Sequence, residues 1–158
     1  GLPLGSGGVL VDAALEAAPG IRCAGDIAAH FHPTFRRHLR VEHWQVARKQ
    51  GQSIGPALVG PARPYAELPW FWSDQYDVKL EYLGHAPSFD RTVWRGDREG
   101  GTFSVFYLED GLIEAVLAVN DRRTIRWSRS LIPRRRPVDT ATLADTATDL
   151  RELARSEA

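Results

Sequence analysis

The stretch that decides the fold is residues 103–119, FSVFYLEDGLIEAVLAV. Apolar side chains alternate along 103–107, and residues 112–119 form a nearly continuous apolar run. Asp110-Gly111 lies between the two runs, and type I′ turns favour this dipeptide because both of their central residues have positive φ. The stretch therefore predicts two antiparallel strands joined by a tight turn.

Shorter patterns flank this hairpin on both sides. Residues 78–82 alternate apolar and polar side chains, and residues 92–94 read as another short strand. Asn120-Asp121 supplies the cap of a helix that is expected to reach Leu131, with Ile125 facing inward. Residues 67–158 are therefore predicted to form an α+β domain, an antiparallel β-meander followed by helices.

The first sixty residues carry weaker signals. Residues 5–8 predict a turn that leads into a short strand, and a second short strand is expected to end at Gly25-Asp26. Residues 41–59 predict a helix with close packing at Gly51 and an apolar stripe of Trp44, Ala47, Gly51, Ile54 and Leu58. Two strands and one helix cannot close a core. Residues 1–60 are therefore expected to be the last part of a larger α/β domain, with 61–66 as a linker.

Composition excludes several classes of protein. Lys plus Arg and Asp plus Glu each number 20, and this zero net charge argues against a nucleic-acid binder. No apolar run approaches the ~20 residues of a transmembrane helix, so no membrane association is expected. Cys23 is the single cysteine, which excludes internal disulfides and cysteine-built zinc sites. A reducing compartment, the cytoplasm, is expected.

The first candidate site is Gly25-Asp26, at the predicted end of a strand. Ligands of open α/β sheets bind beyond the carboxyl ends of strands, where a carboxylate can accept hydrogen bonds from sugar hydroxyls. A phosphate would be repelled, so a ribose or ribityl hydroxyl is the expected partner. The alternative interpretation is that Asp26 caps a helical turn starting at Ile27.

Four of the five histidines lie within residues 30–43. His30 and His32 could supply two metal ligands from one side of a strand. No acidic residue or cysteine stands at a ligand spacing beside them, so solvated or capping histidines are favoured and no metal site is predicted.

Trp70-Phe71-Trp72 is the third candidate. Alternate side chains of a strand face opposite ways, so three consecutive aromatic rings cannot all enter one core. At least one ring is expected to lie at an interface, either as a plug between domains or against a planar ligand.

Arginines gather in two clusters. Arg36, Arg37 and Arg40 precede the predicted helix, and residues 120–136 contain seven arginines against one acidic residue. Nucleic-acid binding would require stacking aromatics on the same face, and only Trp127 is nearby. Solvated faces are therefore favoured, with attraction of an acidic protein partner as the alternative.

Taken together, these segments resemble the C-terminal portion of FAD-dependent NAD(P)H:ferredoxin reductases, the reductase components of oxygenase and P450 systems. The resemblance covers nearly the whole chain in order. It rests on residues 21–26 (IRCAGD), 40–44 (RVEHW), 69–75 (PWFWSDQ), 82–85 (YLGH), 89–91 (FDR), 95–97 (RGD), 106–108 (FYL), 118–120 (AVN) and 136–139 (RPVD).

This resemblance implies cofactor-binding roles for five residues. Asp26, with Gly25 beside it, is implied to hydrogen-bond the ribityl and pyrophosphate region of FAD, and the backbone N–H of Trp44 to face the pyrimidine edge of the flavin. Trp70 and Trp72 are implied to lie near the isoalloxazine ring and the ferredoxin-docking side. Electrons would pass from NAD(P)H through FAD to a [2Fe–2S] ferredoxin, and Arg36, Arg37 and Arg40 would steer that acidic partner.

The sequence departs from the family in lacking the family's pyrophosphate-binding motif. Neither a Gly-x-Gly-x-x-Gly motif nor an NAD(P)-binding domain is present, so missing N-terminal FAD and NAD(P) domains are expected as partners. The chain alone is expected to be inactive and to retain no stoichiometric flavin. The alternatives are a free-standing, non-catalytic docking or dimerisation module that keeps the fold, and a nucleic-acid binder that uses the arginines.

Overall fold

The computed structural model describes residues 1–155. The chain divides into two compact units, Gly1–Pro69 and Trp70–Ala158. Residues 61–69 form neither helix nor strand. Within this segment, however, Tyr65 is buried and its N–H donates to the carbonyl of Ala13 (2.7 Å). The segment is therefore anchored to the first unit rather than extended through solvent.

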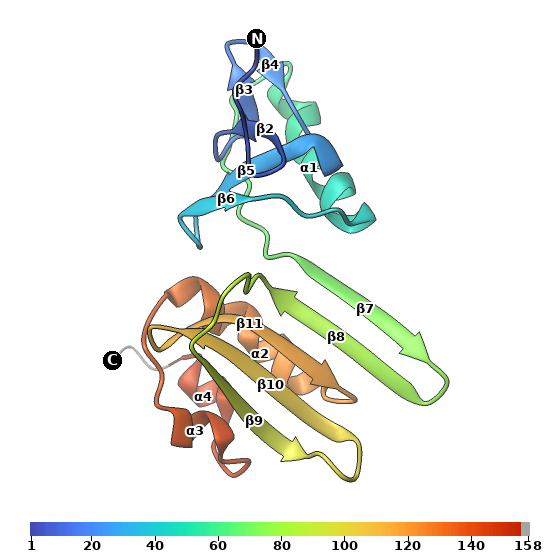
Figure 1. Cartoon of the computed structure of the whole chain (residues 1–158), viewed down its shortest axis with the longest axis vertical. Coiled ribbons are helices and arrows are strands. Elements are labelled where there is room, and N and C mark those ends of the chain that lie inside the picture. The colour runs from blue at the N-terminus through green and yellow to red at the C-terminus, as the bar shows by residue number, and fades with distance from the viewer. Residues whose placement is uncertain (156–158) are drawn as a thin grey trace. The chain divides into compact units, whose positions relative to one another are not determined.

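The first unit is built on short strands (Figure 1). The strands β1, β2, β5 and β6 form a sheet in that order, with β2 and β5 parallel and the other pairs antiparallel. The strands β3 and β4 form a separate two-stranded ribbon. The elements are β1 (Leu4–Gly5), β2 (Gly8–Val11), β3 (Glu16–Ala18), β4 (Ile21–Arg22), the 3₁₀ turn η1 (Gly25–Ile27), β5 (Ala28–His32), β6 (Arg37–Leu39) and α1 (Trp44–Ala57).

The expectation of only two strands in this unit was therefore wrong. Six strands of two to five residues are present, and most are too short to show an alternating pattern. They enclose a small apolar core of Val9, Val11, Leu15, Ala28 and Tyr65. The predicted turn at 5–8 is confirmed, with positive φ at Ser6 and Gly7.

The predicted stripe of the helix was only partly right, since Ile54 packs against this core and Ala47 lies beside Gly25. The buried residues of α1 are Val46 and Gln50, whereas Trp44 is 56% exposed and Leu58, just beyond the helix, is 69% exposed. A Cβ at Gly51 would meet nothing within 4 Å, so this glycine does not mark close packing. The apolar pattern missed the two most buried positions of the helix, one of which is a polar glutamine.

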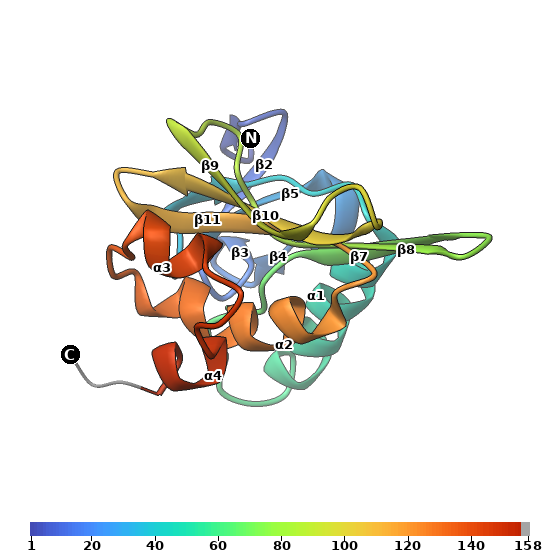
Figure 2. The ribbon, with the colours of Figure 1, turned by 90° about the horizontal axis from the view of Figure 1, so that it is seen from below.

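The second unit is a five-stranded antiparallel sheet with helices on one face (Figures 1 and 2). The predicted α+β fold class is confirmed. Its elements are β7 (Trp70–Gln75), β8 (Val78–Gly84), β9 (Arg91–Asp97), β10 (Thr102–Glu109), β11 (Leu112–Val119), α2 (Arg122–Leu131), the 3₁₀ turn η2 (Ile132–Arg134), α3 (Thr140–Ala144) and α4 (Leu150–Leu153).

The strand order is β7-β8-β11-β10-β9 rather than a consecutive meander. The residues after β8 lead the chain to the far edge of the sheet, where β9 begins, and β11 then fills the place beside β8. A Cβ at Gly84 would lie 2.3 Å from the carbonyl oxygen of Glu114, and φ there is +99°. This close approach of β8 to β11 therefore requires glycine.

Two local predictions are confirmed in this unit. Asp110 and Gly111 form the turn between β10 and β11 with φ of 52° and 75°. Asp121 is the N-cap of α2 and accepts hydrogen bonds from the N–H (3.1 Å) and hydroxyl (2.6 Å) of Thr124. Ile125, on the inner face of α2, is 2% exposed.

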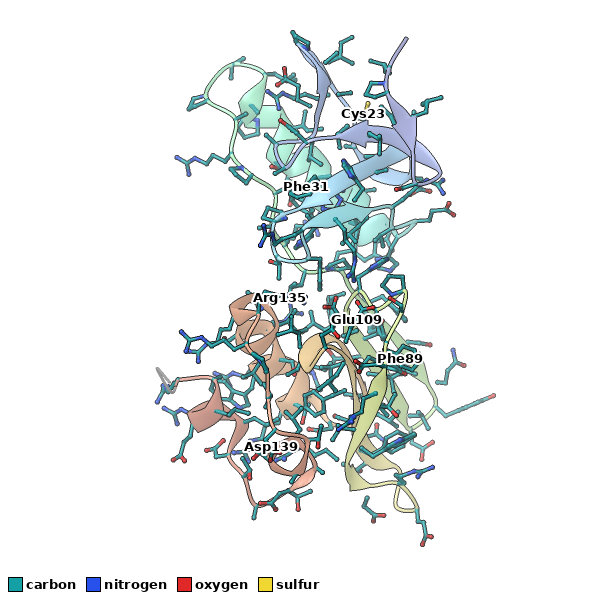
Figure 3. All side chains as sticks on the ribbon, turned by 60° about the vertical axis from the view of Figure 1, so that its left-hand side comes forward. Cys23, Phe31, Phe89, Glu109, Arg135 and Asp139 are labelled. Carbon is teal, nitrogen blue, oxygen red and sulfur yellow. The ribbon has the colours of Figure 1, made fainter. Side chains whose placement is uncertain are left out.

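The helices cover the sheet face that carries Phe106, Leu83 and Val116, all fully buried. On this face β8 contributes Glu81 and Leu83, whereas its alternating apolar residues, Val78, Leu80 and Tyr82, are on the opposite face. In Figure 3, Phe89 lies on the strand side of this unit, and Arg135 and Asp139 lie on the helix side.

Candidate functional site

The first candidate residues lie in the turn η1, not at the end of a strand. Gly25 is buried with φ of +76°, and its N–H donates to Oε1 of Gln50 on α1 (2.8 Å). A Cβ at this position would lie 3.2 Å from the Cβ of Ala47. Glycine is favoured here both by the positive φ and by the closeness of the helix.

Asp26 lies exposed inside this turn. The N-cap position belongs to Ala24, and residues 28–32 form β5, so neither the predicted helical turn after Asp26 nor a capping role for it was right. The backbone carbonyl of Asp26 accepts a hydrogen bond from Nε of Arg40 (2.7 Å). The turn therefore presents the Asp26 side chain outward on a fixed backbone.

Trp44 begins the helix against which this turn packs. Its N-cap is His43, whose side chain makes no capping hydrogen bond, and its indole is exposed. The first helical turn contains no acidic residue, so the positive end of the helix dipole is not offset by a side chain of that turn. Ile27, 56% exposed, adds apolar surface beside Asp26. An exposed carboxylate, a helix N-terminus and apolar surface are thus brought together in one unit.

The histidines of β5 are part of the interior, which corrects the prediction of solvated or capping side chains. His30 and His32 are 1% and 0% exposed. Gln50 donates to Nδ1 of His30 (3.2 Å), while the two ring nitrogens of His32 contact the carbonyl of Glu67 (3.1 Å) and the N–H of Thr34 (3.2 Å). Within residues 1–155, no group of three or more metal-binding side chains is close enough to hold an ion.

The tryptophans of the second unit form a pair on β7. Trp70 and Trp72 project to the same side of the strand and stack, with ring centroids 4.8 Å apart and planes 26° apart. Nε1 of Trp70 donates to Oε2 of Glu81 (3.0 Å), and the guanidinium carbon of Arg129 lies 5.1 Å from the centroid of the Trp70 ring. A cavity of about 210 Å³ opens beside the pair, lined by Trp70, Trp72, Asp74, Lys79, Glu81 and Arg122.

Phe71 points to the opposite face, as the alternation of a strand requires. Its ring stacks on Tyr82 (5.5 Å between centroids), which is followed by Tyr107 (6.2 Å) and Phe89 (5.1 Å). Burial is the largest cause that raises the pKa of the Tyr82 hydroxyl above its ordinary value. Both sheet faces near β7 thus carry aromatic surface.

The arginines of residues 120–136 have different environments. The side chains of Arg122 and Arg123 are 79% and 74% exposed, which fits a solvated face. Arg135 instead pairs with the buried carboxylate of Glu114 (2.6 Å). This pair was missed because the sequence gives no sign that Glu114, inside an apolar strand, has a partner 21 residues later.

Comparison with known proteins identifies the second unit. Residues 70–154 match the family model described as the reductase C-terminal domain. The ferredoxin–NAD(+) reductase component of the anthranilate 1,2-dioxygenase system of Burkholderia cepacia is 44% identical over 146 residues, which are 91% of this chain and 36% of that protein. Putidaredoxin reductase of Pseudomonas putida is 33% identical over 153 residues, 97% of this chain and 36% of that protein.

Solved structures agree with these relatives. The covalent complex of putidaredoxin reductase with putidaredoxin contains a chain that matches 99% of this one with a TM-score of 0.87 and 32% identity, over 38% of its own length. The ferredoxin reductase for the CYP199A2 system of Rhodopseudomonas palustris matches 97% of this chain, with a TM-score of 0.85 and 34% identity over 38% of that chain.

The class of protein is thus defined, and the predicted resemblance is confirmed. This chain belongs to the reductase C-terminal family, whose relatives named above are ferredoxin reductases. It spans just over a third of the length of those curated relatives. Within residues 1–155, no helix has the length and apolar character needed to cross a membrane.

Proposed function

We propose that this chain acts within a flavoprotein reductase that passes electrons from NAD(P)H through FAD to a [2Fe–2S] ferredoxin. The observation that carries the proposal is the 44% identity to a dioxygenase-system reductase component over 91% of this chain. This relationship extends through both units, so it includes the turn that contains Asp26 as well as the tryptophan pair. The relatives named above are all reductases, and they lend no support to a free-standing docking module.

The environment of Asp26 fits the polyol part of a flavin nucleotide. A carboxylate accepts hydrogen bonds from hydroxyl groups, and Asp26 is exposed beside Ile27 and near the start of α1. Gly25, by its positive φ and its bond to Gln50, holds the turn so that this carboxylate faces outward. Asp26 would therefore hold ribityl hydroxyls, and Gly25 would let the turn that carries Asp26 pack closely on α1.

The start of α1 fits the electron-rich edge of a flavin ring. Helix N-terminal N–H groups favour partial or full negative charge. Trp44 contributes such an N–H and a broad apolar side chain. Bound FAD would supply the chemistry of accepting a hydride and releasing single electrons, and the protein would supply binding and orientation.

Trp70 and Trp72 would line the ring system of the flavin and the docking side for the electron acceptor. Their stacked geometry and partial exposure support this role, since planar rings pack well against other planar rings.

An acidic ferredoxin is the proposed partner. Among the arginines expected to steer it, Arg36 is exposed, whereas Arg40 already bonds Asp26 and Glu42. Exposed Arg122 lines the cavity beside the tryptophans and adds positive charge there. Putidaredoxin reductase has been captured covalently joined to putidaredoxin, which supports a small electron-transfer protein as partner. We place this electron transfer in the cytoplasm, in keeping with the single cysteine.

The flavin content of the complete open reading frame that contains this chain tests the proposal. We expect about one FAD for each chain, in keeping with a single nucleotide site. Asp26→Ala should lower that ratio at limiting FAD, whereas Asp77→Ala, an exposed aspartate at the β7–β8 turn, should not. A full-length product that contains no flavin would refute the proposal.

The 158-residue chain offers a second test. It contains no pyrophosphate-binding glycine motif, so it should emerge from purification without stoichiometric flavin. A yellow protein with one flavin for each 158-residue chain would show that these residues bind the cofactor alone.

A further inference from the structure

The Trp70 indole is contacted on its edge as well as on its face. Its face stacks on Trp72 and lies near Arg129, and its edge N–H donates to Glu81. A tryptophan side chain has two rotatable bonds, so face contacts alone leave more than one orientation of the ring accessible. The directional hydrogen bond at the edge selects one of them.

Glu81 is an unusual residue for its position. It lies on the helix-covered face of β8 and is only 9% exposed. Burying a carboxylate is costly unless hydrogen-bond donors compensate for the lost water. Nε1 of Trp70 donates a hydrogen bond to Oε2 (3.0 Å), and Arg122 forms an ion pair in which its Nε lies 3.4 Å from Oε1.

These two partners of Glu81 come from different elements. Trp70 is the first residue of β7, which pairs with β8, and Arg122 is the first residue of α2. Glu81 therefore connects the tryptophan pair to the helix that covers this sheet face. Because the Arg122 side chain is 79% exposed, solvent weakens its hold, and the shorter bond to Trp70 is the stronger of the two.

We propose that Glu81 is a positioning residue, which fixes the Trp70 indole in its stack on Trp72 and so sets the orientation of the pair toward its ligand. The part of this inference that names a flavin ring as the ligand rests on the proposed function. The part that concerns the geometry of the tryptophan pair does not rest on it, because every contact lies within Trp70–Ala158. A leucine at position 81 would keep the burial but leave the indole N–H without its acceptor.

Indole N–H signals in a ¹H–¹⁵N spectrum of the full chain test this directly. The chain has five tryptophans, and the signal lost in Trp70→Phe assigns Trp70. In Glu81→Leu that signal should move upfield, and its exchange with water should speed up about tenfold or more, since a hydrogen bond to a charged group is lost. Glu81→Gln, whose amide oxygen still accepts, should show a smaller change. Glu99→Gln, which changes an exposed carboxylate in the turn between β9 and β10, should leave the Trp70 signal in place.

Circular dichroism measures the stacking of the two indole rings directly. Two stacked indoles give a coupled pair of bands, and Glu81→Leu should lower its amplitude by about half or more as the rings lose their fixed geometry. Glu81→Gln should retain most of it. An unmoved Trp70 signal in Glu81→Leu, or an unchanged band pair despite a moved signal, would overturn the proposal.

A third measurement separates this inference from the proposed function. In the FAD-loaded full-length product, Glu81→Leu should perturb the flavin absorption spectrum relative to Glu99→Gln. If the spectrum is unperturbed while the other two measurements agree with prediction, the positioning role stands and the proposed flavin contact of the tryptophan pair is wrong.

Discussion

The two candidate contact regions of this chain are held in different ways. In Gly1–Pro69, Asp26 is positioned by backbone conformation, through the positive φ of Gly25 and its N–H bond to Gln50. In Trp70–Ala158, the tryptophan pair is positioned by other side chains, above all Glu81 and Arg129. The structure of the first region should therefore be sensitive to one methyl group added at Gly25. The structure of the second should depend on the core residues and helix caps that stabilise its sheet and helices.

The largest effect is expected in the core of the second unit. Phe106 is 0% exposed at the centre of the sheet, and Phe106→Ala should lower the free energy of unfolding by about 3–5 kcal/mol, because a cavity replaces the ring. Urea unfolding followed by circular dichroism measures it. Phe89→Ala, which removes a half-exposed ring, should cost clearly less. Equal costs for the two substitutions would contradict the assignment of the core.

A smaller loss of stability is expected at the turn that contains Gly25. Gly25→Ala forces an L-residue into positive φ and brings a methyl to 3.2 Å from Ala47, at a cost of about 2 kcal/mol. The turn should shift, so flavin content of the full-length product should fall as well. Gly51→Ala, where a Cβ meets nothing, is the matched control and should be neutral or stabilising. If Gly25→Ala changed neither stability nor flavin content, the claim that backbone conformation positions Asp26 would be wrong.

The helix cap of the second unit ranks next. Asp121 accepts from the N–H and hydroxyl of Thr124 and from the hydroxyl of buried Ser104 (2.8 Å). Asp121→Ala should therefore cost about 1–2 kcal/mol in thermal or urea unfolding. Asp121→Asn, which can still cap, should recover most of this loss. A neutral Asp121→Ala would show that α2 does not depend on its cap.

The smallest effect is a pH dependence of stability that arises from three aspartates of the second unit. Hydrogen bonds from the backbone N–H groups of Thr142, Ala147 and Arg151 hold the pKa values of the Asp139, Asp145 and Asp149 carboxyls below the ordinary value. The unfolded chain lacks these bonds. The stabilisation is therefore present above the ordinary pKa, about 4, and is lost as pH falls through the lower folded pKa values.

Thermal melts between pH 7 and pH 3 test this dependence. The variant with asparagine at all three positions keeps capping groups that do not titrate, so its melting temperature should fall less on acidification. An identical fall in both proteins would show that other groups cause the acid sensitivity.

Local chemistry explains which parts of the fold could be predicted. The hairpin at 103–119 depends on a two-residue turn, and the start of α2 depends on one capping aspartate, so each signal lies within a few residues. The resemblance named Trp70 and Trp72 as candidate site residues, but the sequence alone did not give the contacts that these side chains make.

The missed features depend on contacts between distant residues. Gln50 is buried with hydrogen bonds to Gly25 and His30, and Glu81 is buried with a hydrogen bond from Trp70 and an ion pair to Arg122. A hydrophobic pattern assigns such residues to the surface, because it registers polarity and not satisfied hydrogen bonds. Most strands of the first unit were missed for another reason, because they have too few residues for any period to appear.

The most direct test of the central claim is the NAD(P)H-driven reduction of a [2Fe–2S] ferredoxin by the full-length product that contains this chain, followed by the absorbance of the ferredoxin. Our account predicts reduction that requires FAD and that slows in Trp72→Ala, whereas Phe89→Ala, an exposed aromatic away from the pair, leaves it unchanged. FAD-loaded protein that oxidises NAD(P)H but reduces no [2Fe–2S] ferredoxin, or reduction at the same rate without Trp72, would contradict it.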